Sequence, residues 1–143
     1  MAPRDAETDA DANANAIRRQ IESDPYCATL GIELAELGAG TARTRLEITD
    51  NLTNFHGTPH GGAIYSLADA AFAAASNADG ETAVALETNV SYLEAVEVGT
   101  VLTATARETH DGGRTAEYEV VVADATEETD DRVATFRGRV YKP

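Results

Sequence analysis

The chain has 143 residues, enough for one domain with a substantial hydrophobic core. Its formal net charge of −14 excludes nucleic acid as a ligand, because phosphate backbones are bound by clustered Lys and Arg. The sequence has no signal-peptide h-region, no run of about 18 apolar residues, and a single cysteine, Cys27, which cannot form an intramolecular disulfide. We therefore expect a cytoplasmic protein that does not bind a membrane.

The charge balance also indicates an environment. Asp and Glu number 25 against 11 Lys and Arg, and Lys142 is the only lysine. Dense carboxylates keep a protein surface hydrated, and molar salt screens their mutual repulsion. We expect a protein from a high-salt cytoplasm, although an acidic protein of a GC-rich organism has a similar composition.

The first part of the chain is predicted to hold a tail and a short helix. Residues 1–12 are small and acidic without periodicity, which is typical of a disordered tail, so we place a single domain at residues 13–143. Ile17 and Ile21 then lie at helical spacing, and Pro25 closes this helix.

The rest of the chain alternates in the manner of strands, interrupted by one long helix. Apolar and polar residues alternate over residues 29–40, 41–49, 82–95, 100–110, 114–128 and 132–143. Turn sequences such as HDGG separate several of them, which predicts antiparallel hairpins. Residues 61–78 form a helix that is apolar on nearly all sides and must be buried. We therefore predict an α+β fold, a curved antiparallel sheet wrapped around one long central helix.

Residues 54–80 contain one charged side chain, Asp69, before Asp79. We interpret this segment as a loop and helix that the sheet encloses, so that charge is excluded from it. Burying an unpaired carboxylate costs several kcal/mol or raises its pKa. Asp69 is therefore expected to be functional and to face a cleft, although an Asp hydrogen-bonded at a helix–sheet junction is the structural alternative.

The sequence HGTPHGG precedes Asp69 and supplies hydrogen-bond donors. Gly61 and Gly62 leave backbone N–H groups open at the start of the helix, where the helix dipole favours a negative oxygen. Such groups can form an oxyanion hole, although the glycines could also serve only a tight turn. His60 is expected to shape the entry to the helix, and Asn54 either orients a water or carbonyl or forms an Asx turn.

Other chemistries fit the sequence less well. His56 and His60 have a zinc-binding spacing, but the residues between them do not build a helix and no third ligand is evident. There is no Gly-rich nucleotide loop for NAD or ATP, and no G-x-S-x-G motif surrounds Ser66. We expect neither a metal nor a cofactor.

The segment NFHGTPHGGAIYSLADAAFAAASN, with VSYLEAVEVGTVLTATARE, a GGRT turn and a closing VATFRGRVYK, resembles the hotdog-fold thioesterases. Within them it is most similar to the PaaI-type group, which hydrolyses phenylacetyl-CoA-type thioesters. The resemblance spans roughly Cys27 to Lys142. It implies a hotdog fold, dimers whose sheets join edge to edge and often pair into tetramers, and an active site at the dimer interface.

Matching positions imply roles for individual residues. Gly61 corresponds to the glycine whose N–H polarises the thioester carbonyl, and Asp69 to the catalytic carboxylate of the other subunit. Asn54 matches the asparagine that holds water or the carbonyl, and His60 the histidine before that glycine. We expect Asp69 to act as a general base or as a nucleophile, with acyl-CoA as the substrate.

Four points stay open. Relatives carry a Ser or Thr on the strand after the helix, where this chain has Ala85, with Thr82, Thr88 or Ser91 as substitutes. Four arginines are candidates for the CoA phosphates, Arg107, Arg114, Arg137 and Arg139, and we favour Arg114. Four aromatic residues are candidates for the acyl pocket, Phe55, Tyr65, Phe72 and Tyr92. A hotdog hydratase using His60 with Asp69, and a non-catalytic acyl-CoA-binding module, are the alternative functions.

Overall fold

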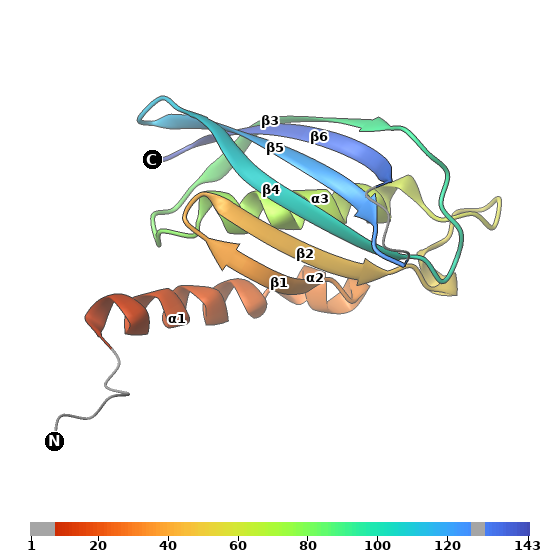
Figure 1. Cartoon of the computed structure of the whole chain (residues 1–143), viewed down its shortest axis with the longest axis horizontal. Helices are drawn as coiled ribbons and strands as arrows, with labels where there is room; N and C mark the ends of the chain where they lie inside the picture. Colours follow the sequence, from red (N-terminus) through yellow and green to blue (C-terminus); the bar gives the residue numbers. More distant parts are fainter. Residues whose placement is uncertain (1–7, 127–130) are drawn as a thin grey trace, which may run out of the picture.

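The computed structural model describes residues 8–126 and 131–143, which form three α-helices and six β-strands (Figure 1). The helices are α1 (Asp9–Glu22), α2 (Pro25–Leu30) and α3 (Gly61–Ser76). The strands are β1 (Glu33–Gly38), β2 (Thr41–Glu47), β3 (Val84–Tyr92), β4 (Val101–Asp111), β5 (Thr115–Asp124) and β6 (Arg132–Tyr141). Among the described residues, no helix combines the length and apolar character needed to cross a membrane.

The six strands form one antiparallel sheet in the order β1-β2-β4-β5-β6-β3. The sheet curves around α3, which lies behind it in Figure 1. The β4–β5 hairpin turns at Gly113, whose φ of 89° favours glycine, as the HDGG pattern predicted. The predicted α+β hotdog architecture is confirmed, although residues 127–128 of the predicted fifth strand lie outside the described residues.

The core lies between α3 and the concave face of the sheet. Leu67, Ala68 and Phe72 are at most 1% exposed, and the buried residues of β4, β5 and β6 face them. The Phe72 ring packs on Phe136 with ring centroids 5.6 Å apart. A Cβ at Gly138 of β6 would lie 2.6 Å from Cζ of Phe72, so the absent side chain lets the ring approach the strand. Phe72, predicted as a pocket candidate, is therefore a core residue.

The first helix is longer than its sequence pattern predicted. Thr8 caps α1, because its Oγ1 accepts the N–H of Asp11 at 3.1 Å. Residues 9–12, which the sequence assigned to the tail, are therefore helical, and the remainder of the predicted tail, residues 1–7, lies outside the described residues.

A second helix, α2, was not predicted. Pro25 closes the first helical segment as expected, but it is also the first residue of α2. Asp24 caps this helix, since its Oδ1 accepts the N–H of Cys27 at 3.1 Å. The sequence Asp-Pro is itself a helix-start signal, and α2 was missed because six residues are too few to show an apolar period.

The sheet covers only part of α3. The helix packs mainly on β2, β4 and β5, and α1 and α2 lie beside its remaining face. On that face Ala73 is exposed, while Asp69 and Ala70 are half-buried. The face of α3 that carries Asp69 is therefore not covered by the sheet and lines a cleft.

Candidate active site

The start of α3 is fixed by His60. The Nδ1 of His60 accepts the N–H of Gly62 at 2.8 Å, and the N–H of His60 donates to the carbonyl oxygen of Leu52 at 2.8 Å. A Cβ at Gly62 would lie 2.8 Å from this Nδ1, so glycine makes room for the capping ring. His60 shapes the helix entry, as expected, and occupies the N–H of Gly62 that the sequence analysis assigned to the substrate.

The N–H of Gly61 differs from its neighbour. Within the described residues no acceptor bonds to it, although the Tyr92 hydroxyl donates to the Gly61 carbonyl oxygen at 2.9 Å. A Cβ at Gly61 would lie 3.2 Å from Tyr92, so this aromatic ring packs closely on the helix start. Of the two glycines, Gly61 therefore offers the open donor at the positive end of the helix dipole.

Asn54 organises the loop before α3. Its Oδ1 accepts the N–H groups of His56 and Thr58 at 3.0 and 3.2 Å, which is the Asx-type turn predicted as one alternative. Within the described residues its Nδ2 group has no hydrogen-bond partner. The side-chain amide can therefore still donate to a water or a carbonyl oxygen.

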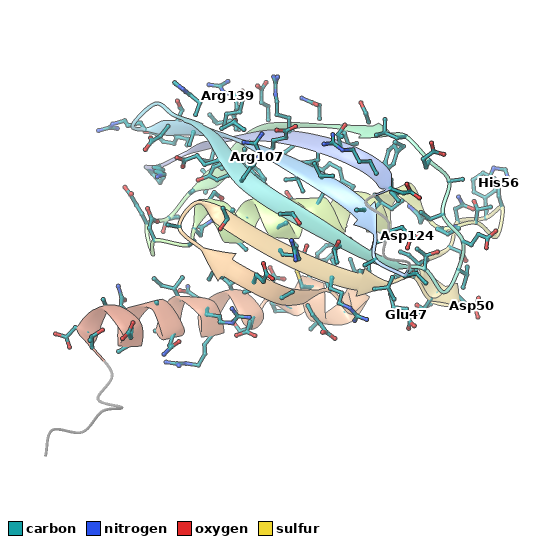
Figure 2. All side chains as sticks on the ribbon, viewed as in Figure 1. Glu47, Asp50, His56, Arg107, Asp124 and Arg139 are labelled. Atoms are coloured by element: carbon teal, nitrogen blue, oxygen red, sulfur yellow. The ribbon has the colours of Figure 1, made fainter. Side chains whose placement is uncertain are left out.

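This loop is exposed, contrary to the prediction that the sheet encloses it. Residues 55–58 are exposed, and Phe55 is 93% exposed. Figure 2 shows His56 at the outer end of the loop, away from the sheet. In this segment the absence of charge therefore marks an uncovered surface and not the core of the subunit.

Asp69 lies in the middle of α3 and faces a cleft of about 1220 Å³ between α3 and the N-terminal helices. Within the described residues it makes no hydrogen bond and no ion pair. Burial raises the pKa of the Asp69 carboxyl above its usual range, and the negative charge of Asp24 raises that pKa further. A half-buried carboxylate without a partner is suited to accept a proton.

Gly61 and Asp69 cannot act on one carbonyl within a single chain. They are eight residues apart in one helix, which separates them by about 12 Å along its axis. Hydrogen-bonding and proton-transfer groups must both lie about 3 Å from the reacting atoms. The two groups can therefore form one site only if they come from two subunits.

Hydroxyl groups lie on both sides of Asp69. Thr82 lines the same cleft as Asp69, whereas the Thr88 hydroxyl is hydrogen-bonded to that of Tyr65 at 2.6 Å. The Tyr26 hydroxyl of α2 lies 2.8 Å from Oγ of Ser66, one turn before Asp69. Because α2 was not predicted, the sequence analysis missed the contribution of Asp24 and Tyr26 to this cleft.

The arginines lie away from the start of α3. The Arg114 guanidinium is 3.3 Å from the Tyr141 hydroxyl, in the β4–β5 turn at the opposite end of the sheet from the loop before α3 (Figure 1). Arg107 pairs with Glu119 at 2.8 Å, and Figure 2 shows Arg107 and Arg139 far from His56. Within one chain, Arg114 is thus not brought together with Gly61.

The described residues contain no group of three or more His, Cys, Asp and Glu side chains that could hold a metal ion. The ring of His60 is engaged in capping α3, and the His56 ring stacks near Phe55 with ring centroids 4.0 Å apart. The two histidines therefore have separate structural environments.

The fold and the sequence together define the class of protein. The profile of the thioesterase superfamily matches residues 56–141, and the chain belongs to this family. The acyl-coenzyme A thioesterase PaaI of Escherichia coli is 35% identical over 130 residues, covering 91% of this chain and 89% of the relative. The 1,4-dihydroxy-2-naphthoyl-CoA hydrolase of Listeria monocytogenes is 36% identical, covering 69% and 82% of the two chains.

A solved structure of the E. coli PaaI protein, from the phenylacetic acid degradation operon, superposes with a TM-score of 0.85. The two sequences are 32% identical, and the superposition covers 94% of this chain and 96% of the PaaI chain. The predicted hotdog fold and the resemblance to PaaI-type thioesterases are thereby confirmed.

Proposed function

We propose that Asp69 and Gly61, from two subunits, form the active site of an acyl-CoA thioesterase. Membership of the thioesterase superfamily makes the protein a thioester hydrolase, and its similarity to an acyl-CoA thioesterase and a CoA hydrolase supports acyl-CoA as the substrate. The observation that carries the residue assignment is Asp69 itself, an unpartnered carboxylate with a raised pKa on an otherwise apolar helix.

In the proposed reaction the thioester carbonyl oxygen accepts the N–H of Gly61. As a water oxygen attacks the carbonyl carbon, Asp69 takes the water proton and the N–H stabilises the negative charge that develops on the carbonyl oxygen. The C–S bond then breaks, so that the free acid and the CoA thiolate leave. In the nucleophilic variant a carboxylate oxygen of Asp69 attacks the carbonyl carbon, the C–S bond breaks with loss of the CoA thiolate, and water then hydrolyses the mixed anhydride to the free acid and the Asp69 carboxylate. Asn54, through its free Nδ2 group, orients the water or carbonyl.

The second subunit joins along β3. This strand lies at an edge of the sheet and pairs only with β6 in the described chain. Val84 and Leu86 are 48% and 52% exposed on it, and an uncovered apolar edge invites pairing with another chain. A homodimer with a continuous sheet covers this edge, and two such dimers form a tetramer in the same proposal.

The proposal extends to the surroundings of the enzyme. The charge of −14 supports a cytoplasm of high salt as the environment of the protein. Glu–Arg pairs lie across the outer face of the sheet. Arg114 serves the CoA phosphates only if it comes from another subunit. One catalytic domain is proposed, with its predicted boundary at residue 13 moved to the cap of α1 at Thr8.

Thiol release in molar KCl tests the function. Wild-type protein is expected to release CoA from phenylacetyl-, benzoyl- or short-chain acyl-CoA, and Asp69→Asn and Asp69→Ala to reduce kcat about 10²- to 10⁴-fold. Equal rates for wild type and both variants would show that Asp69 is not the catalytic carboxylate. Binding of acyl-CoA without turnover, seen as a rise in Tm, would show a binding module instead.

A further inference from the structure

The cleft beside Asp69 has one wall made by α3 and another made by the N-terminal segment. The N-terminal wall includes Ile17 and Ile21 of α1, and Tyr26 of α2. Two contacts hold this wall in place. The Tyr26 hydroxyl bonds to Ser66, and Ile17 reaches the turn after α3, where a Cβ at Gly80 would lie 3.0 Å from its Cδ1. The cleft is therefore a built part of the subunit and includes a segment outside residues 56–141, the range that the family profile matches.

The α3 wall is lined by small side chains next to the catalytic carboxylate. Ala70, Ala73 and Ala74 line the cleft, and Ala73 is exposed although it lies in the middle of an apolar helix. Alanine at these positions leaves open space beside Asp69 that larger apolar residues would fill. The space therefore suits an apolar group attached to the carbonyl on which Asp69 acts.

The charges of the cleft have one sign. Glu22, Asp24, Glu33 and Asp69 line it, and within the described residues no Arg, Lys or His does. At the edge of the cleft the Arg18 guanidinium pairs with Glu22 at 3.5 Å and donates to the carbonyl oxygen of Leu34 at 3.3 Å, so it is already engaged. The lining itself thus offers no cation to CoA phosphates or to a carboxylate at the end of an acyl chain. An anion placed there loses hydration and meets like charges, both of which oppose binding.

We infer that this cleft receives the acyl group of the thioester, and that its lining selects uncharged acyl groups over acyl groups that end in a carboxylate. The inference rests on the proposed thioesterase function, and it assigns the selection to acidic residues of the N-terminal segment that includes α1, α2 and the start of β1. The nucleotide part of CoA lies outside the cleft, because its phosphates would meet the acidic residues of the lining. An uncharged acyl group fits beside the small apolar residues.

Charge selection is tested with hexanoyl-CoA and glutaryl-CoA, which have similar length and differ in a terminal carboxylate. We expect kcat/KM to favour hexanoyl-CoA by roughly 10- to 100-fold in the wild type. Glu33→Gln and Asp24→Asn should each reduce this preference several-fold. Glu47→Gln, which removes one charge from an exposed position outside the cleft, should leave it unchanged.

The position of the acyl group is tested by filling the cleft. Ala73→Leu keeps a strong helix former at an exposed site, so we expect an unchanged Tm and a loss of at least about tenfold in kcat/KM for hexanoyl-CoA, with acetyl-CoA spared. Ala12→Leu, on the exposed surface of α1 outside the cleft, is the matched control and should have no effect.

Two kinetic outcomes overturn the inference. One is equal hydrolysis of hexanoyl- and glutaryl-CoA, and the other is an Ala73→Leu variant that loses acetyl-CoA and hexanoyl-CoA activity alike. A binding measurement distinguishes failure of this inference from failure of the proposed reaction. In Asp69→Asn, hexanoyl-CoA should raise Tm more than glutaryl-CoA does, whether or not the wild type hydrolyses either thioester. Equal shifts in Tm reject the inference, while absent turnover rejects only the catalytic proposal.

Discussion

Gly61 and Gly62 are neighbours at the start of α3, and their missing side chains serve different contacts. Gly62 gives its N–H and its space to the capping ring of His60, whereas within the described residues the N–H of Gly61 has no acceptor. Gly62 therefore serves the start of the helix, and the Gly61 N–H is available for the oxyanion role that we propose.

Replacing Gly61 with proline tests the role of the Gly61 N–H, because proline has no backbone N–H. Proline is favoured at the first helical position, and His60 has φ −73° and ψ 129°, which suits a residue before proline. Gly61→Pro should start α3 normally but lower kcat about 10²- to 10³-fold, since one oxyanion donor is lost. Gly61→Ala is the control, because it meets Tyr92 in the same way and keeps the N–H. If both variants have the same kcat, the N–H does not act in catalysis.

Asp24 is expected to shift the pH dependence of the reaction. Burial raises the pKa of Asp69 first and Asp24 adds to it, so the Asp24→Asn change should lower the pKa of Asp69. The acid limb of kcat/KM then moves to lower pH, because the base stays ionised further into acid. Asn caps a helix as well as Asp does, so α2 should persist. A pH profile identical to the wild type contradicts the electrostatic coupling.

Asp69 should also reduce the stability of the folded protein at neutral pH. Its folded pKa is raised above the ordinary value of an Asp carboxyl, so the stability of the protonated form is present below that ordinary value and is lost as pH rises through the folded pKa. Asp69→Asn, which resembles the protonated form, should therefore have a higher Tm than the wild type at pH 7. Thermal unfolding should show the difference shrinking as pH falls through the folded pKa and absent below about pH 4. A lower Tm at pH 7 would indicate a stabilising role for the carboxylate.

At the scale of elements, the contact between α3 and β6 depends on Gly138. Its position against the buried Phe72 ring leaves no space for a methyl group, so Gly138→Ala should lower the free energy of unfolding by about 1–3 kcal/mol. Chemical denaturation measures this change. Phe72→Leu in the Gly138→Ala background relieves the contact and should recover part of the loss. If Gly138→Ala is as stable as the wild type, the ring does not press on β6.

The strands and α3 were predictable because their patterns are long and regular. Strand alternation reports one buried face, and the HDGG turn fixes one hairpin, so the order of elements from β1 to β6 matched the structure. The helix α2 has six residues and no apolar period, and α1 starts in a segment with few apolar residues. The cleft that these two helices form with α3 could therefore not be predicted. Asp69 could be selected as a candidate from its apolar neighbours, and its catalytic role stays a prediction.

A charge-poor segment can be buried or exposed, and composition does not distinguish the two cases. Charge is absent from α3 because the sheet buries most of it, and from residues 55–58 although they are exposed. The sequence analysis assigned both parts to the interior. The buried helix and the exposed loop can be distinguished only once side-chain exposure is known, as for Phe55.

At the scale of the whole molecule, the proposed active site needs residues from two subunits. Gly61 and Asp69 lie about 12 Å apart along α3, while β3 leaves an apolar edge open for a second chain. The outer face of the sheet carries paired charges such as Arg107–Glu119, which keep it hydrated. Assembly through β3 thus accounts both for the exposed edge and for the separation of the two catalytic groups.

Subunit complementation tests this account most directly. The variants Gly61→Pro and Asp69→Asn carry different tags, are co-expressed, and are purified as mixed dimers through both tags. Each mixed dimer then has one site with both changes and one site with neither. We predict about half of the wild-type kcat per dimer, although each variant alone is inactive. Mixed dimers as inactive as the single variants would show that Gly61 and Asp69 do not meet across the interface.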